Sequence, residues 1–180
     1  MELIRTPIDD LMLIRPKVLQ DERGYFFESY NKLKFNQLGI STQFVQDNQS
    51  FSKYGTLRGL HFQKIPHAQA KLVRVIKGKI LDVAVDIRPN SRTFGQHLAF
   101  ELSDDNFLQV LIPKGFAHGF VVLSETALVV YKCDELYNAP SEGGIHYADP
   151  DLDIDWRVPK DKIILSPKDQ KNPFLRELKF

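Results

Sequence analysis

Three polar segments interrupt the apolar stretches of this sequence, and each carries side chains that can move protons or bind anions. The segments are Gln46-Asp47-Asn48, Arg58-Gly59-Leu60-His61-Phe62-Gln63 and Pro113-Lys114-Gly115-Phe116-Ala117-His118-Gly119-Phe120. His61 is a candidate general base, because an imidazole ordinarily titrates near neutral pH, where a general base is most effective. A histidine beside a glycine turn is also a common structural residue, so residue type alone leaves both interpretations open.

The spacing of these histidines does not make a metal site. The Pro113-x-Gly115-x-x-His118 turn resembles the second motif of the cupin superfamily, whose metal-binding members also carry His-x-His and a glutamate in a first motif. The corresponding segment here reads His61-Phe62-Gln63, so one of the usual ligands is missing. The single Cys133 offers no cysteine-rich alternative. We therefore predict that no metal is bound and disfavour a metal-dependent oxygenase.

Further short motifs run in order through nearly the whole chain. They are Asp21-Glu22-Arg23-Gly24 with Phe27-Glu28, Phe44-Val45-Gln46-Asp47-Asn48, Leu57 to Gln63, Lys71-Leu72-Val73-Arg74-Val75, Asp82-Val83-Ala84-Val85-Asp86-Ile87-Arg88, Pro113 to Phe120, Tyr131-Lys132-Cys133, Asp149-Pro150, Ile154-x-Trp156 and Leu165-Ser166-x-Lys168-Asp169. Together they resemble the dTDP-4-dehydrorhamnose 3,5-epimerase family of nucleotide-sugar metabolism. Asp134 departs from the threonine that is common there, at a position that carries no catalytic group.

The resemblance implies a homodimeric, cupin-like jelly roll that inverts C3 and C5 of a dTDP-4-keto-6-deoxy sugar without a cofactor. A hydrogen on a carbon beside the C4 ketone is acidic because the resulting carbanion delocalises into an enolate. Each inversion therefore requires a base on one face of the sugar, an acid on the other face, and a cation or hydrogen-bond donor at the enolate oxygen.

His61 is the candidate base, and the resemblance assigns Asp169 as the carboxylate that holds its tautomer, as the acid does in a catalytic triad. A structural interpretation of Asp169 also fits. Ser166-Pro167-Lys168-Asp169 has an N-cap serine, a proline at the first helical position and an acidic residue three positions after the serine. The two roles are compatible.

Tyr131, Lys71 and His118 complete the reacting end of the expected site. Tyr131 is the candidate acid, because a phenol with a pKa of about 10 can reprotonate an enolate, and Tyr137 is its nearest competitor. Lys71 is expected to place its ammonium beside the C4 oxygen, and His118 to donate to the same region. Without the resemblance, Tyr131 is a core aromatic residue, Lys71 a solvated strand residue and His118 a structural turn residue.

The nucleotide moiety requires cations for two phosphates and polar groups for the base and ribose. Arg23 and Arg58 suit bidentate phosphate contacts. The resemblance adds the binding residues Glu28, Gln46, Asp47, Asn48, Glu142 and Lys168. Arg23 as part of a surface turn and Glu28 as a solvated strand residue are the alternatives. The sequence has no glycine-rich phosphate loop, which disfavours kinases and dinucleotide oxidoreductases.

The elements that must position these residues are predominantly strands, because the apolar residues recur with a period of two. The pattern predicts a hairpin over Lys71–Arg88 that turns at Lys77-Gly78-Lys79. Other strands are expected over Tyr25–Tyr30, Leu98–Leu102, Leu108–Ile112, Gly119–Leu123 and Ala127–Cys133, with helices over Asn31–Leu38 and from Ser166. The sequence thus predicts an all-β, cupin-type jelly-roll sandwich or barrel with a few short peripheral helices.

Length and charge narrow the class of protein further. The chain has 180 residues, with 24 Lys and Arg against 23 Asp and Glu. We expect one domain over residues 1–180, with an irregular tail from about residue 140. The near-zero net charge predicts no nucleic-acid partner, and the absence of a long apolar segment or signal pattern predicts a cytoplasmic protein that does not enter membranes.

The sequence therefore predicts an isomerase that converts dTDP-4-dehydro-6-deoxy-D-glucose into dTDP-4-dehydro-L-rhamnose. Two alternatives stay open. A sister enzyme that inverts only C3 or only C5 would share the same base and nucleotide-binding groups. A non-catalytic cupin that binds a nucleotide sugar is disfavoured because His61, Lys71 and Tyr131 are all retained.

Overall fold

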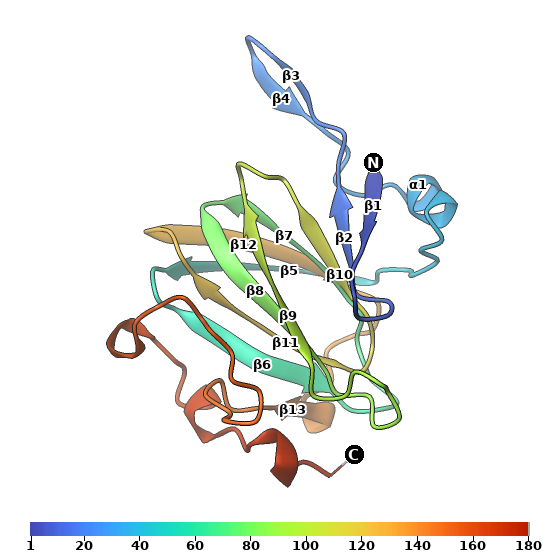
Figure 1. The fold of residues 1–180 in the computed structure, drawn as a ribbon. Helices are drawn as coiled ribbons and strands as arrows, with labels where there is room; N and C mark the ends of the chain where they lie inside the picture. The colour runs from blue at the N-terminus through green and yellow to red at the C-terminus, as the bar shows by residue number, and fades with distance from the viewer. Residues whose placement is uncertain (180) are drawn as a thin grey trace.

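The computed structural model describes residues 1–179 and consists of two antiparallel sheets packed face to face (Figure 1). The six-stranded sheet has the order β1 (Glu2–Arg5), β2 (Met12–Arg15), β10 (Gln109–Ile112), β7 (Lys71–Lys77), β12 (Thr126–Cys133) and β5 (Gln46–Lys53). The five-stranded sheet has the order β13 (Glu142–Gly144), β6 (Leu57–Gln63), β11 (Phe116–Val122), β8 (Lys79–Asp86) and β9 (His97–Ser103). The predicted all-β sandwich is confirmed.

Alternation along the strands divides the apolar side chains among three layers. Between the sheets, Val73 and Val129 of the six-stranded sheet belong to one buried cluster with Ile80 and Phe120 of the five-stranded sheet. This cluster fills only part of the space between the sheets, and polar residues line the remainder.

The outer face of each sheet is also covered. Residues such as Leu81 and Val83 on the five-stranded sheet pack with Trp156 of the carboxyl-terminal segment. On the six-stranded sheet, Leu72 packs with Phe35. Phe35 belongs to the helix α1 (Lys32–Gln37), which begins after Asn31 and is followed by Gly39, as the sequence predicts.

The predicted hairpin around Gly78 is wrong. β7 and β8 flank this residue as expected, but they belong to different sheets and do not pair. Gly78 has φ +82°, and a Cβ there would lie 2.1 Å from the carbonyl oxygen of Thr126, so only glycine allows the chain to cross between the sheets here. Periodicity cannot distinguish a hairpin partner from a strand in the facing sheet, because both continue the alternation.

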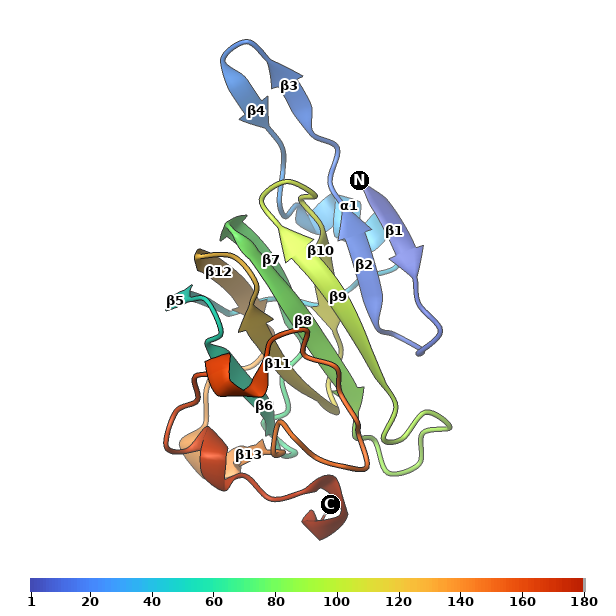
Figure 2. The ribbon, with the colours of Figure 1, turned by 60° about the vertical axis from the view of Figure 1, so that its left-hand side comes forward.

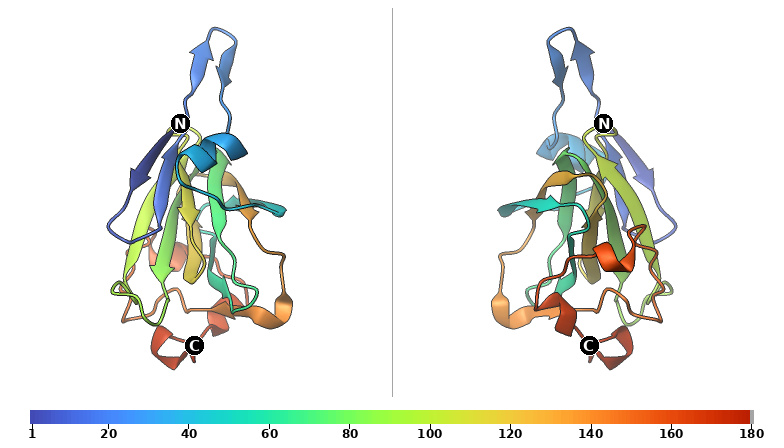
Figure 3. Two further views of the ribbon diagram at one scale, coloured as in Figure 1. Left: turned by 90° about the vertical axis from the view of Figure 1, so that its right-hand side faces the viewer. Right: turned by 90° about the vertical axis from the view of Figure 1, so that its left-hand side faces the viewer.

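A two-stranded hairpin projects from the sandwich. It consists of β3 (Leu19–Asp21) and β4 (Gly24–Phe26), so the strand expected over Tyr25–Tyr30 is shorter and begins earlier than predicted. Figures 2 and 3 show this hairpin at the end of the molecule opposite the carboxyl-terminal segment. Leu19, Tyr25 and Phe26 on it are exposed.

The carboxyl-terminal segment, from Ile145 to Leu178, wraps the five-stranded sheet. It contains three short 3-10 helices: η2 (Lys160–Lys162), η3 (Asp169–Lys171) and η4 (Leu175–Glu177); a further one, η1 (Ala139–Ser141), precedes β13. Buried Asp149 ties the segment together, since its carboxylate accepts from the backbone N–H groups of Asp151 and Leu175. A single domain over the whole chain stays a prediction. No helix between residues 1 and 179 has the length and apolar character to cross a bilayer.

Candidate active site

A cavity of about 510 Å³ opens between the two sheets and brings together all four predicted catalytic residues. The five-stranded sheet contributes His61 from β6 and His118 from β11, and the six-stranded sheet contributes Lys71 and Tyr131. Asp169 reaches the cavity from η3. Residues separated by as many as 108 positions in the sequence therefore converge on one site.

A β-bulge orients the β6 residues. His61 pairs with His118 and Arg58 pairs with Phe120, so three residues of β6 span the interval that two residues span on β11. Residues three apart in a regular strand point to opposite faces, but the extra residue lets Arg58 and His61 line the same cavity. Gly59 lies in this bulge at φ +125°, and a Cβ on it would lie 2.6 Å from Gly119 Cα.

The His61 ring is held by Asp169. The His61 Nε2 atom lies 2.6 Å from Asp169 Oδ1, and the side-chain exposures are 31% and 5%. Because an ionised carboxylate only accepts, Nε2 carries the hydrogen and Nδ1 of the neutral ring keeps its lone pair. Burial lowers the pKa of His61, and Asp169 opposes that effect. The ring is thus a free base at neutral pH.

Asp169 makes both contacts that the sequence suggests, although the helix η3 begins at Asp169 with Lys168 at its N-cap position, later than the predicted N-cap Ser166. Its backbone N–H donates to Ser166 Oγ at 3.1 Å, which is the predicted capping contact. Its carboxylate instead bonds His61, so the local turn and the long-range pair use different atoms of the same residue.

The Lys71 ammonium forms no hydrogen bond or ion pair within the described residues, although it lines the cavity. Burial lowers the pKa of Lys71, while the neighbouring groups of Cys133, Asp82 and Glu142 act in the opposite direction. An unpaired cation in a low-dielectric cavity is suited to stabilise an oxyanion.

Tyr131 and its competitor Tyr137 are separated by their surroundings. Tyr131 lines the cavity and packs against the core cluster, and burial raises the pKa of its phenol. Tyr137 is 58% exposed and donates its hydroxyl to Glu142 at 2.8 Å. The two phenols therefore differ in burial and in hydrogen bonding.

The expected binding residues form an adjoining group. Arg58 is held by a hydrogen bond from its Nε to Ser52 Oγ at 3.1 Å, and Lys168 pairs with Glu142 at the cavity wall. A neighbouring cavity of about 390 Å³ shares His61, Lys71, Tyr131 and Glu142 with the first one and is also lined by Gln46, Asn48 and Tyr137. Burial raises the pKa of Glu142, but bonds from Lys168 and Tyr137 outweigh this and keep its pKa below the ordinary value.

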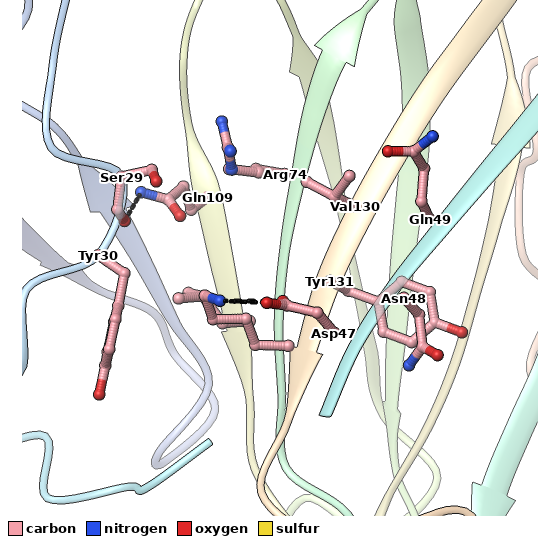
Figure 4. A pocket seen from close by; sticks show the side chains of 11 residues that line it. Ser29, Tyr30, Asp47, Asn48, Gln49, Arg74, Gln109, Val130 and Tyr131 are labelled. Atoms are coloured by element: carbon pink, nitrogen blue, oxygen red, sulfur yellow. Dashed lines mark hydrogen bonds and ion pairs between the residues drawn. The ribbon is translucent and has the colours of Figure 1, made fainter. Parts of the chain in front are cut away.

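Asp47 points elsewhere. It is paired with Lys132 at 2.7 Å, in a separate cavity that also contains Arg74 and Gln109. Figure 4 shows Asp47 extending toward its partner while Asn48 points the other way, toward Tyr131, its pairing partner across the sheet. Alternation along β5 therefore separates the predicted Gln46-Asp47-Asn48 group.

Arg23 and Glu28 also lie outside the cavities around His61. Arg23 sits at the hairpin tip, has an 86% exposed side chain and pairs with Asp21. Glu28 follows the hairpin and pairs with Lys34. Within one chain, the structure does not bring these two residues to His61.

Asp82, which bonds a cavity residue, and Ser50, which lines the cavity, are absent from the sequence prediction of the site. Asp82 on β8 accepts from His118 Nε2 at 2.8 Å, and both side chains are nearly inaccessible. Ser50 on β5 lines the cavity with a buried, unpartnered hydroxyl. The signal for Asp82 was present, because it alternates with Leu81 and Val83 on a strand that is buried on both faces.

Gln63 explains why the cupin metal motif is incomplete. Its side chain donates to the carbonyl oxygens of His67 and Leu136 and accepts from the N–H of Asn138 at 2.7 Å. It therefore anchors two loops. Among residues 1–179, no three His, Cys, Asp or Glu side chains converge as metal ligands, so the donor set does not fit a cupin metal.

A β-sandwich whose interior holds a carboxylate-bound imidazole, a partly buried phenol and an ammonium unpaired within the described residues defines a cupin-like enzyme of acid–base chemistry. Residues 5–177 match the family model described as dTDP-4-dehydrorhamnose 3,5-epimerase, and the chain belongs to this family of isomerases. The predicted family, cupin-like fold and isomerase class are confirmed.

Relatives agree over almost their full lengths. The chain is 50% identical to dTDP-4-dehydrorhamnose 3,5-epimerase of Methanothermobacter thermautotrophicus over 175 residues, which are 97% of this chain and 94% of the relative. The crystal structure of dTDP-4-dehydrorhamnose 3,5-epimerase from Elizabethkingia anophelis has 55% identity and a TM-score of 0.95, with coverage of 100% and 99%. The crystal structure of dTDP-6-deoxy-D-glucose-3,5-epimerase from Legionella pneumophila, in complex with dTDP-4-keto-L-rhamnose, has 49% identity and a TM-score of 0.95, with coverage of 99% and 94%.

Proposed function

We propose that this chain inverts C3 and C5 of dTDP-4-dehydro-6-deoxy-D-glucose and releases dTDP-4-dehydro-L-rhamnose, with His61 and Tyr131 as base and acid. The observation that carries these roles is the convergence of the His61–Asp169 pair, Lys71 and Tyr131 on one cavity between the sheets. The complex of the Legionella relative with dTDP-4-keto-L-rhamnose supports the same substrate class here.

In each half-reaction, His61 Nδ1 removes the hydrogen from the carbon beside the ketone. The C–H electron pair forms a double bond to C4, and the carbonyl π pair moves onto the C4 oxygen. Lys71 stabilises the resulting enolate oxygen. Tyr131 then delivers its phenol proton to the opposite face of the same carbon, and both side chains re-equilibrate with water. The sequence is repeated at the second carbon, and no cofactor takes part.

The nucleotide occupies the adjoining groups. Arg58 and Lys168 supply positive charge for the diphosphate. The amides of Gln46 and Asn48 offer hydrogen bonds, and the exposed ring of Tyr137 offers a stacking surface for the base. The buried free thiol of Cys133 is consistent with the reducing cytoplasm as the proposed location.

Proton NMR in deuterated water tests the chemistry. With dTDP-4-keto-6-deoxyglucose as substrate, the product is expected to carry deuterium at both C3 and C5, because imidazolium and phenol exchange with solvent between turnovers. Deuterium at only one carbon would identify a single-site epimerase. No deuterium at either carbon, with the ligand bound, would identify a non-catalytic binder. His61→Asn is expected to lower kcat by about 10²- to 10⁴-fold while nucleotide affinity is kept.

We propose in addition that the enzyme is a homodimer in which the β3–β4 hairpin of one protomer completes the site of the other. Arg23 and Glu28 are expected binding residues, yet the hairpin projects away from the end where η3 supplies Asp169 (Figures 1 and 2). The exposed Leu19, Tyr25 and Phe26 give the hairpin an apolar surface that a second copy would cover.

Mixing two inactive variants tests this arrangement. In a dimer of Arg23→Ala and His61→Asn protomers, one site would combine the intact His61 with the intact hairpin of its neighbour. An equal mixture refolded together is therefore expected to regain roughly a quarter of wild-type activity, because half of the dimers are mixed and each has one intact site. If the hairpin served its own chain, every site would keep one defect and no activity would return.

A further inference from the structure

Strand β8 carries two inaccessible carboxylates, Asp82 and Asp86, on the same face. Asp86 is fully satisfied: it accepts from the side chains of Arg88, Ser91 and Thr93 and from the backbone N–H of Arg88. Asp82 is not satisfied, because Oδ2 accepts from His118 while Oδ1 has no hydrogen-bond partner. A buried oxygen without a partner requires an explanation, and at Asp82 that explanation lies beside the active cavity.

The position of Asp82 links it to both groups on the enolate side of that cavity. His118, which Asp82 holds through Nε2, is the direct strand neighbour of His61. The Asp82 carboxylate also acts electrostatically on the Lys71 ammonium, as Cys133 and Glu142 do, and none of them forms a hydrogen bond or ion pair with it within the described residues. One buried negative charge thus serves two groups from two different strands.

We propose that Asp82 is a positioning residue: it orients the ring of His118 and supplies the negative charge opposite the Lys71 ammonium. The inference rests on the proposed function, because it assigns these two groups to the enolate oxygen. His118, held at Nε2, presents Nδ1 as its remaining ring nitrogen. Lys71 has to stay protonated in a buried cavity to act as a cation, and a carboxylate that spends no bond on it leaves all three ammonium hydrogens for the substrate.

Other charged groups face Lys71 and must be separated from Asp82. Cys133 of β12 and Glu142 of β13 also favour the charged ammonium, and the Lys71 charge in turn lowers the pKa of His61. Cys133 is a neutral thiol in this environment, because burial raises its pKa. Glu142 is already bonded to Lys168 and Tyr137. Asp82 is the carboxylate of this group with a buried oxygen that has no hydrogen-bond partner among the described residues.

The test compares Asp82→Asn with Asp86→Asn, a matched loss of a buried carboxylate on the same strand. The amide of Asp82→Asn can still accept from His118, so this change removes mainly the charge. We expect kcat to fall by about 10²-fold, dTDP affinity to stay within about twofold, and the alkaline limb of the kcat profile to move down by about one pH unit. Asp86→Asn is expected to lower the unfolding temperature and to leave that limb in place.

Titration of Lys71 by NMR, with carbon-13 at the lysine Cε and assignment by Lys71→Met, gives a readout that does not depend on turnover. Lys71 is expected to lose its proton at lower pH in Asp82→Asn than in wild type. An unchanged Lys71 titration would overturn the proposal even in an active enzyme, whereas an inactive wild type with the expected titration would refute only the proposed function.

Asp82→Glu keeps the proposal testable if Asp82→Asn does not fold. Glutamate retains the charge but moves the carboxylate by one methylene, so the Lys71 titration is expected to stay near that of wild type while kcat falls. A kcat equal to that of wild type would show that the position of this carboxylate is unimportant and would overturn the proposal.

Discussion

The proposed mechanism depends on the tautomer of one residue, His61. A carboxylate at Nε2 leaves the lone pair on Nδ1. Burial lowers the pKa of His61 and Asp169 raises it, and together they determine the pH at which Nδ1 becomes protonated. Histidine supplies the base, but Asp169 decides which nitrogen acts.

Replacing Asp169 with Asn tests this dependence. The amide can donate to Nε2, which favours the tautomer without a lone pair on Nδ1, so kcat is expected to fall by about 10²- to 10⁴-fold. Because Asp169 raises the pKa of His61 against the effect of burial, its loss lowers that pKa further. The acid limb of kcat/KM, which reports protonation of the base, is therefore expected to move to lower pH.

The control is Asp161→Asn in η2, where the carboxylate is 72% exposed and pairs with Lys162. This variant is expected to keep the wild-type rate and profile. An Asp169→Asn enzyme with an unshifted acid limb would show that the limb belongs to another group.

At the residue scale, the sequence predicts which residues line the site better than it predicts which side chains bond to one another. His61, Lys71, Tyr131 and Asp169 were chosen by type and motif, and the structure brings them together. Asp82 was missed because an acidic residue in an apolar strand has the same letter whether it faces solvent or a histidine across the sheet.

The bulge in β6 brings two site residues of that strand, Arg58 and His61, to the same cavity. Without it, the alternation of side chains would place Arg58 and His61 on opposite faces of the sheet. The close approach of β6 and β11 at Gly59 leaves no room for a side chain, since a Cβ would lie 2.6 Å from Gly119 Cα and 2.7 Å from the His118 oxygen.

Gly59→Ala is therefore expected to lower the free energy of unfolding by about 2–4 kcal/mol and to reduce activity in the folded fraction. Gly24→Ala is a matched control, because Gly24 has nearly the same φ, +122°, with nothing within 4 Å of the added Cβ. It is expected to lose only about 1 kcal/mol. Urea unfolding at one protein concentration measures both, and equal losses would contradict the role of the close approach.

The wrong prediction of a hairpin at Gly78 and the correct prediction of the strands have the same physical origin. A period of two identifies strands and their faces, so β7 to β12 were found with bounds close to those observed. It contains no information on which sheet a strand joins, because sheet membership depends on hydrogen bonds to residues far away in the sequence. The crossover of β7 and β8 between sheets was therefore beyond periodicity.

At the scale of the whole molecule, a mechanism that uses side chains alone predicts that chelators leave the turnover of the enzyme unchanged. Exhaustive dialysis against EDTA is expected to leave turnover within about twofold of the untreated enzyme, because the described ligand set offers no three-residue metal site. Added Zn²⁺, Mn²⁺ or Fe²⁺ is expected to bring no gain. Activity that disappears on dialysis and returns with one divalent ion would mean that the metal prediction is wrong.

The separation of 108 residues between His61 and Asp169 has a consequence for biosynthesis. A ribosome finishes the strands of both sheets, which carry His61, Lys71, His118 and Tyr131, well before it reaches residue 169. A nascent or prematurely terminated chain that stops short of that residue holds an imidazole with no carboxylate to choose its tautomer. Among the proposed catalytic residues, translation thus adds last the carboxylate that orients the base. An incomplete product has His61 but cannot hold it in the tautomer that removes the proton.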